Sequence, residues 1–144
     1  MIVVDTGGLY AFLDADDDHH ERARRAVEAE PGPFLMSPFV LAELDYLVQR
    51  RLGTAAELAL LDDVEADIYR LVPFGADDLN RSTTLLRQYG DLDIGLADAS
   101  VAVVAARHRT VRLLTTDERH FRTVRPLRGG EAFTLALFDE ASDL

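Results

Sequence analysis

The stretch Ile2-Val3-Val4-Asp5-Thr6-Gly7-Gly8 decides the fold of this chain. Three apolar residues run directly into a carboxylate, two glycines follow, and a helical pattern begins at Leu9. A short apolar run that ends at a glycine turn is typical of a strand buried on both faces, as in a parallel sheet. Asp5 would then lie at the carboxyl end of this strand, where open α/β sheets bind ligands. A carboxylate buried there needs a positively charged partner.

The remainder of the chain alternates predicted strands with predicted helices. Further strands are expected over 34–36, 69–72, 111–115 and 132–138. Helices are expected over 9–13, 21–30, 38–51, from 54 onward, 77–89, 96–107 and 118–121. No repeat or low-complexity linker divides the chain, so the alternation predicts one α/β domain over 1–144 with a mainly parallel sheet. The acidic tail, 139–144, is expected to fray.

The composition excludes several classes of function. Among 144 residues the net charge is −11, from 26 acidic and 15 basic residues, and every basic residue is arginine. Without lysine, a Schiff base or a P-loop lysine is impossible. The acidity argues against a broad, non-specific nucleic-acid binder, but not against an enzyme that meets nucleic acid through metal ions and a few arginines.

Cysteine and long apolar runs are both absent from the sequence. The absence of cysteine rules out disulfides and thiolate metal sites, and it agrees with a reducing cytoplasm. No apolar run approaches the roughly 20 residues of a membrane span, and the start of the chain lacks the pattern of a signal peptide. We therefore expect a cytoplasmic protein that does not enter the membrane.

Four carboxylates occupy unusual positions. Asp5 and Asp117 each end an apolar strand, whereas Glu43 and Asp98 are predicted to interrupt the apolar stripe of a helix. Parallel neighbouring strands would bring Asp5 and Asp117 to one edge of the sheet, and Asp98 could face that edge. Taken singly, Asp5 and Asp117 also suit helix caps, and Asp98 suits a first-turn partner of the helix dipole.

Convergence of these carboxylates would point to a metal site. Carboxylates that meet repel one another, and their pKa values rise unless a cation neutralises them. An all-oxygen site suits Mg²⁺ or Mn²⁺. Such an ion can activate water and stabilise the leaving oxygen of a phosphodiester. The four acids together therefore predict metal-assisted hydrolysis of a phosphodiester.

Four motifs in order resemble those of the PIN-domain family, and more narrowly those of the VapC-type toxins of toxin–antitoxin pairs. They are Val4-Asp5-Thr6, Ser37-Pro38-Phe39-Val40-Leu41-Ala42-Glu43-Leu44, Gly95-Leu96-Ala97-Asp98-Ala99-Ser100 and Leu114-Thr115-Thr116-Asp117-Glu118-Arg119-His120-Phe121. The order and the spacing of the motifs match, and the resemblance covers nearly the whole chain.

The resemblance implies a compact three-layer α/β/α fold and a Mg²⁺- or Mn²⁺-dependent endoribonuclease. It makes Asp5, Glu43, Asp98 and Asp117 the acidic metal ligands, with the Thr116 hydroxyl supporting the site. It also implies an RNA substrate, a homodimer, and a cognate VapB-type antitoxin whose C-terminal segment blocks the acidic groove.

The region after Asp117 departs from the pattern of many relatives. They carry another acid shortly after the last aspartate, whereas here Arg119 stands two residues on, with Glu118 and His120 on either side. Ligation of a second metal ion is therefore left open. Asp93 is a candidate for that role, with a loop or helix-cap role as the alternative.

Other readings of the sequence are less well supported. A receiver domain needs a lysine, and a haloacid-dehalogenase-type phosphatase needs a second aspartate where Gly7 stands. His19 and His20 are expected to be solvated in a polar turn. The serious alternative is a non-catalytic PIN domain that binds RNA or protein, and the presence of all four acids argues against it.

Overall fold

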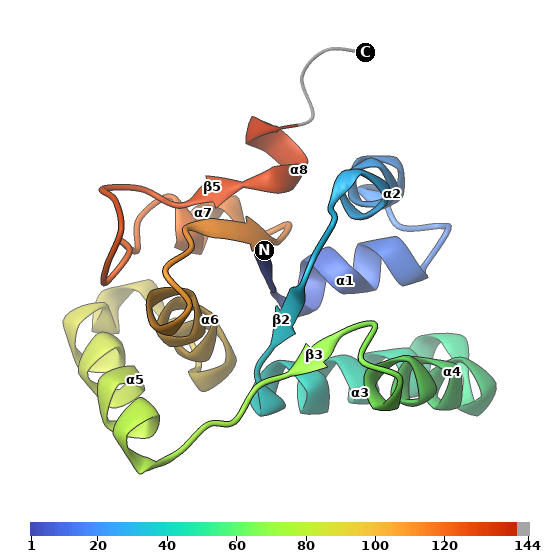
Figure 1. Cartoon of the computed structure of the whole chain (residues 1–144), viewed down its shortest axis with the longest axis horizontal. Coiled ribbons are helices and arrows are strands. Elements are labelled where there is room, and N and C mark those ends of the chain that lie inside the picture. The colour runs from blue at the N-terminus through green and yellow to red at the C-terminus, as the bar shows by residue number, and fades with distance from the viewer. Residues whose placement is uncertain (141–144) are drawn as a thin grey trace.

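A parallel β-sheet forms the centre of the computed structural model, which describes residues 1–140 (Figure 1). Its strands stand in the order β3-β2-β1-β4-β5, and every neighbouring pair is parallel. Within the described residues the five strands are β1 (Ile2–Val4), β2 (Phe34–Met36), β3 (Arg70–Leu71), β4 (Arg112–Leu114) and β5 (Thr134–Leu135).

Helices cover both faces of the sheet, which confirms the predicted α/β/α fold. The helices of residues 1–140 are α1 (Thr6–Leu13), α2 (His20–Ala29), α3 (Pro38–Leu52), α4 (Thr54–Glu65), α5 (Ala76–Gln88), α6 (Leu96–Arg107), α7 (Glu118–Phe121), α8 (Ala136–Asp139) and the 3-10 turn η1 (Gly90–Leu92). In Figure 1, α1 and α2 lie on one side of the strands and α5 and α6 on the other. None of these helices is long and apolar enough to cross a bilayer.

The central strand β1 marks the point where the order of the strands reverses. Val3 pairs with Leu35 on one side and with Leu113 on the other. The chain builds β2 and β3 outward from one edge of β1, and it then returns to add β4 and β5 at the other edge. Open α/β sheets bind ligands at such a switch point, outside the carboxyl ends of the strands. The residues after β1 and β4 therefore occupy the expected ligand position.

The predicted glycine turn before Leu9 is wrong, because α1 begins at Thr6 and contains both glycines. A Cβ atom on Gly8 would collide with the carbonyl of Leu114, and one on Gly7 would lie 2.5 Å from Thr116 Oγ1. The glycines therefore allow α1 to pack closely against the end of β4, and this packing brings the residues after β1 beside those after β4.

The C-terminal region also differs from its prediction. The strand expected over 132–138 is only β5, and α8 follows it directly. Asp139, at the end of α8, accepts a hydrogen bond from Leu135 N (2.8 Å) and pairs with Arg122, while Glu140 pairs with Arg112. The expected fraying of 139–144 therefore does not hold for its first two residues, and 141–144 lie outside the described residues.

Candidate active site

Asp5 follows β1 directly, and only 5% of its surface is exposed. Its Oδ2 atom accepts a hydrogen bond from the Thr115 hydroxyl (2.7 Å), and its side chain does not cap α1. Burial raises the pKa of the Asp5 carboxyl to about 7, with a further contribution from the charges of Asp98 and Asp117, against the opposing effect of the Thr115 hydrogen bond. Asp5 is therefore a buried carboxylate that has no positively charged partner among residues 1–140.

Asp98 and Asp117 converge on the same point from two helix starts. Asp98 Oδ2 accepts a hydrogen bond from Gly95 N (3.2 Å) at the start of α6, and Asp117 Oδ1 accepts one from His120 N (2.9 Å) at the start of α7. Burial raises the pKa of Asp98, and the nearby charges of Asp117 and Glu43 add to this effect. Both aspartates thus cap helices with one oxygen and belong to the acidic group as well.

His120 is the functional candidate that sequence reasoning missed. Its Nδ1 atom lies 2.7 Å from Asp117 Oδ2 and 3.6 Å from Asp98 Oδ2. This buried nitrogen nevertheless makes no contact with the geometry of a hydrogen bond within the described residues. Ligand atoms of Asp98, Asp117 and His120 all lie within 4.8 Å of one another. The available signal was the i, i+3 spacing from Asp117, which places both side chains on one face of a helical turn.

Glu43 does not interrupt the apolar stripe of α3, so that prediction is wrong. The buried stripe consists of Val40, Leu44 and Val48, and Glu43 is exposed beside it. Its negative charge still raises the pKa of Asp98, which places Glu43 at the rim of the acidic group. A polar residue one position away from a helical stripe is solvated, and this explains why Glu43 needs no buried partner.

Thr115 contacts two of the acids through its hydroxyl, whereas the resemblance assigned the supporting hydroxyl to Thr116. The Thr115 hydroxyl is fully buried, donates to Asp5 and accepts a hydrogen bond from Asp117 N (2.9 Å). Thr116 lies beside Gly7 instead. Side chains alternate along an extended chain, so of two adjacent threonines only one points toward Asp5.

A buried pair of hydroxyls fixes α3 against α6. Ser37 Oγ caps α3 by accepting from Val40 N (3.1 Å), and it lies 2.6 Å from Ser100 Oγ. The Ser100 hydroxyl donates to the carbonyl of Ala97 (2.6 Å), within the first turns of α6. The helix that carries Glu43 is thereby joined to the helix that carries Asp98.

The remaining candidates lie elsewhere or have other partners. Asp93 is an exposed loop residue with φ of 60°, and Glu118 is exposed and pairs with Arg122. His20 Nδ1 lies 2.8 Å from the carbonyl of Ala11, and His19 packs edge-on against Phe138. In the part of the chain that the structure describes, none of these four residues belongs to a group spaced for a metal ion.

The donor set suits a divalent cation. It consists of carboxylate oxygens, which are the ligands that Mg²⁺ and Mn²⁺ prefer, and one imidazole nitrogen, which is a ligand of transition metals. No ion pair within residues 1–140 joins an arginine to Asp5, Asp98 or Asp117, and His120 Nδ1 and the nearby Thr6 Oγ1 are buried without hydrogen-bond partners. Carboxylates brought together in this way gain most from a cation that neutralises them.

A family comparison agrees with this geometry. The sequence profile of the PIN domain matches residues 2–126. The chain therefore belongs to the PIN-domain family.

Individual relatives show which kind of PIN-domain protein this chain resembles. Ribonuclease VapC26 of Mycobacterium tuberculosis is 38% identical over 129 residues, which cover 90% of this chain and 96% of that protein. The crystal structure of VapC20 of the same organism, described as a sarcin-ricin loop cleaving toxin, superposes with a TM-score of 0.76 at 25% identity, over 81% of this chain and 90% of that one. These likenesses confirm the prediction of a VapC-type PIN protein.

A third likeness concerns the fold alone. A chain of a toxin-antitoxin complex from Klebsiella pneumoniae has a TM-score of 0.69 at 20% identity, over 91% of this chain and 99% of that one. The arrangement of the sheet and its helices is therefore shared across distant sequences.

Proposed function

We propose that this protein is a Mg²⁺- or Mn²⁺-dependent endoribonuclease and the toxin of a VapBC-type toxin–antitoxin pair, acting in the cytoplasm as one PIN domain over 1–144. The observation that carries the proposal is the convergence of Asp5, Asp98 and Asp117 at the switch point of the sheet, where no arginine of residues 1–140 pairs with them. The ribonuclease VapC26 and the RNA-cleaving VapC20, to which the chain is similar, support RNA as the substrate.

Asp98, Asp117 and His120 are the residues that would hold a metal ion, with Asp5 beside them and Glu43 at the rim. When bound, such an ion supplies Lewis-acid activation of water and stabilisation of charge on the phosphodiester. Hydrogen bonds from Thr115, Gly95 and the His120 amide each hold one oxygen of a carboxylate in place. Thr116 completes the set of candidate site residues through its place next to Asp117.

Asp5 would couple metal binding to the release of a proton. Its pKa of about 7 means that the carboxyl is protonated in an appreciable fraction of metal-free molecules near neutrality. A cation favours the ionised form of the carboxyl. Metal binding at neutral pH would therefore release, on average, a fraction of a proton per molecule. Thr115 keeps the carboxyl oriented in both states by donating to Oδ2.

The partners in this proposal are a cognate VapB-type antitoxin and a second copy of the chain. Exposed apolar side chains on α3, α4 and β3 support a partner surface there, namely Tyr46, Leu58 and Leu71, whose exposed fractions are 59%, 55% and 45%. Apolar side chains grouped on a surface are characteristic of interaction sites.

The test is cleavage of RNA by the purified protein in Mg²⁺ or Mn²⁺, compared with cleavage in EDTA. We expect Asp98→Asn to reduce cleavage by about 10²–10³-fold while the fold is retained, since a charged ligand is lost. Asp93→Asn is the matched control, because it makes the same chemical change at an exposed loop position, and it should leave cleavage intact.

The competing outcome is a folded protein that binds its antitoxin but cuts no RNA with either metal ion. That result would replace the nuclease by a non-catalytic PIN domain that acts as a binding module.

A further inference from the structure

A second cavity, distinct from the acidic site, lies between α5, the last turn of α6 and the loop that follows α7. Its volume is about 380 Å³. The residues that line it are Arg81, Thr84, Leu85, Gln88, Ala106, Arg107, Leu127 and Arg128. We call it the arginine pocket, because three of its eight lining residues are arginines and none is acidic.

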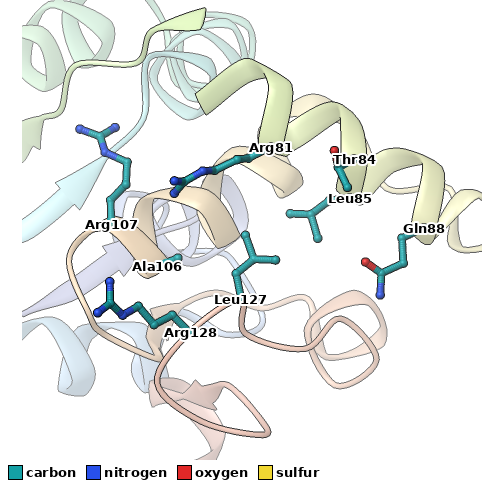
Figure 2. A pocket seen from close by; sticks show the side chains of 8 residues that line it. All are labelled: Arg81, Thr84, Leu85, Gln88, Ala106, Arg107, Leu127 and Arg128. Carbon is teal, nitrogen blue, oxygen red and sulfur yellow. The ribbon is translucent and has the colours of Figure 1, made fainter. Parts of the chain in front are cut away.

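The arginines of this pocket gather positive charge in one place, in a chain with a net charge of −11. Elsewhere on the surface, arginines form ion pairs with nearby acidic side chains, as Arg24, Arg70 and Arg122 do. The side chains of Arg81 and Arg128 are exposed and make no ion pair or hydrogen bond within residues 1–140, as is also true of Arg25 and Arg87 elsewhere on the surface. Figure 2 shows the guanidinium groups of Arg81 and Arg128 on the same side of the pocket as that of Arg107.

Arg107 forms the fixed wall of the pocket. Its Nη1 donates to the carbonyl of Pro73 (2.6 Å) and lies 3.2 Å from Asp78 Oδ2. Two free guanidinium groups beside a tethered one can make several hydrogen bonds to an anion, and their fork geometry matches phosphate. The electrostatics of the pocket therefore favour a phosphate group.

The floor of the pocket is apolar. Leu85 and Ala106 are buried, while Leu127 keeps 46% of its surface exposed over the cavity. Gln88 contributes an amide at the far end from the arginines (Figure 2). An apolar floor suits the flat face of a nucleobase, and an amide suits the polar edge of one. The pocket thus has complementary surfaces for both halves of a nucleotide.

One of the elements that line the pocket, α6, also carries an acid of the active site. Asp98 lies in the first turn of α6 and Arg107 in its last, so the two are about 14 Å apart along the helix axis. Asp117 starts α7, and the chain leads from there to Leu127 and Arg128. A single strand of RNA can reach both places, because binding grooves for single strands cover roughly 4–16 nucleotides.

We propose that the arginine pocket binds one nucleotide of single-stranded RNA away from the cleaved bond, with its phosphate on Arg81 and Arg128 and its base over Leu85 and Leu127. The inference rests on the proposed ribonuclease function for its choice of RNA as the occupant. It makes the pocket a determinant of substrate affinity and leaves the chemistry of cleavage to the acidic site.

Binding is tested separately from cleavage, in the Asp98→Asn background with Mg²⁺ present. The probe is a fluorescent single-stranded RNA of about 12 nucleotides, and its anisotropy is followed over a range of salt concentrations. We expect Arg81→Gln with Arg128→Gln to weaken binding at least tenfold. The slope of log affinity against log salt should fall by about 0.7, because one phosphate of the single strand is no longer neutralised.

The matched control is Arg25→Gln with Arg50→Gln, which removes the same charge from exposed positions on α2 and α3. An equal loss of affinity in this control, or an unchanged affinity in the pocket variant, would overturn the proposal. It would also be overturned if the pocket variant lost affinity for the antitoxin and kept its affinity for RNA, since the pocket would then serve a protein partner.

Kinetics in the active protein give a second readout. The pocket variant should raise KM for a long RNA and leave kcat unchanged, and it should not affect a dinucleotide, which cannot span both places. A fall in kcat on the dinucleotide would contradict the inference. If the wild type cuts no RNA but its RNA binding still depends on the two arginines, the proposed function fails and the pocket assignment stands.

Discussion

Two buried carboxylates lie at opposite ends of β1, and their pKa values shift in opposite directions. Glu30, beside the start of the strand, is 8% exposed and contacts the Met1 amino group (3.1 Å), Arg112 (2.6 Å) and Gly32 N (2.9 Å). Burial alone would raise its pKa, but these partners outweigh burial and lower it. Asp5, after the end of the strand, is equally buried. It has one hydroxyl donor, and its pKa is raised to about 7.

The difference shows which carboxylate the protein neutralises by itself. Around Glu30 the chain itself supplies positive charge. The carboxylate at this end of the sheet is therefore neutralised without an added ion. Around Asp5 the nearest charged groups include two further acids, and their repulsion adds to the cost of burial. Such a site would gain from a cation that binds from outside, and this is the physical basis for proposing a function at the carboxyl end of the sheet.

The largest effect on stability is expected from Asp5→Asn in the metal-free protein. A rise in pKa from 3.8 to about 7 corresponds to about 4 kcal/mol when the group is ionised. Because the folded pKa is raised, wild-type stability should fall as pH increases from 4 to 7 and then level off. The Asn variant should lack this slope and be more stable at pH 8, as measured by urea unfolding. Asp62→Asn, at an exposed position, should leave the slope unchanged.

Metal binding should stabilise the protein through the Asp5 end of the sheet and not through the Glu30 end. At 100 times its dissociation constant, an ion adds about 2.7 kcal/mol to the free energy of unfolding. We expect Mg²⁺ or Mn²⁺ to raise the melting temperature of the wild type and of Arg112→Leu, but not that of Asp117→Asn. An equal rise in Asp117→Asn would place the ion elsewhere.

Arg112→Leu should leave the buried Glu30 carboxylate, beside the start of β1, with less positive charge around it. Removing one partner of a buried ion pair is costly, and with Arg112 partly exposed and the Met1 amino group still present we expect about 2 kcal/mol of destabilisation. Because the pKa of Glu30 is lowered, its contribution is present above pH 4.5 and is lost as pH falls through the folded pKa. The cost should therefore shrink in acid. Arg24→Leu, which breaks exposed pairs that solvent screens, should cost much less.

Thr115→Val should have the smallest effect, about 1 kcal/mol, because it removes the hydroxyl that Asp5 and the amide of Asp117 share. The loss should be greater at pH 8 than at pH 5, since the hydroxyl stabilises the ionised form of Asp5. Chemical denaturation at both pH values measures it. Thr83→Val, which removes an exposed hydroxyl bound to its own helix, serves as control, and an equal loss there would argue against a special role for Thr115.

Much of the fold could be predicted because its signals are local. The apolar run of β1, the Ser37-Pro38 start of α3 and the apolar α6 were each visible as single elements. The prediction failed where long-range contacts decide. The strand expected over 132–138 is cut to Thr134–Leu135 and followed by helix α8, where the Asp139 carboxylate binds both Leu135 N and Arg122. The glycines after Asp5 allow close packing against Leu114 rather than a turn.

The site was predicted in part. Asp5, Asp98 and Asp117 each also suit a helix cap or a first-turn position when taken singly, so it was their coincidence in one chain that indicated a site. Glu43 was misplaced because a helical stripe can be assigned one position off when its neighbours are also apolar. His120 resembles an ordinary helix residue until α6 brings Asp98 within 3.6 Å of it.

The sequence by itself therefore determined the class of fold, the place of the ligand site and the acids that surround it. Only the tertiary structure decided that Thr115 and not Thr116 holds Asp5, that His120 joins the acids, and that Arg81, Arg107 and Arg128 face one pocket. The physical reason is that periodicity and end signals describe one element at a time. Which side chains meet depends on the order of the strands and on how closely the helices pack across them.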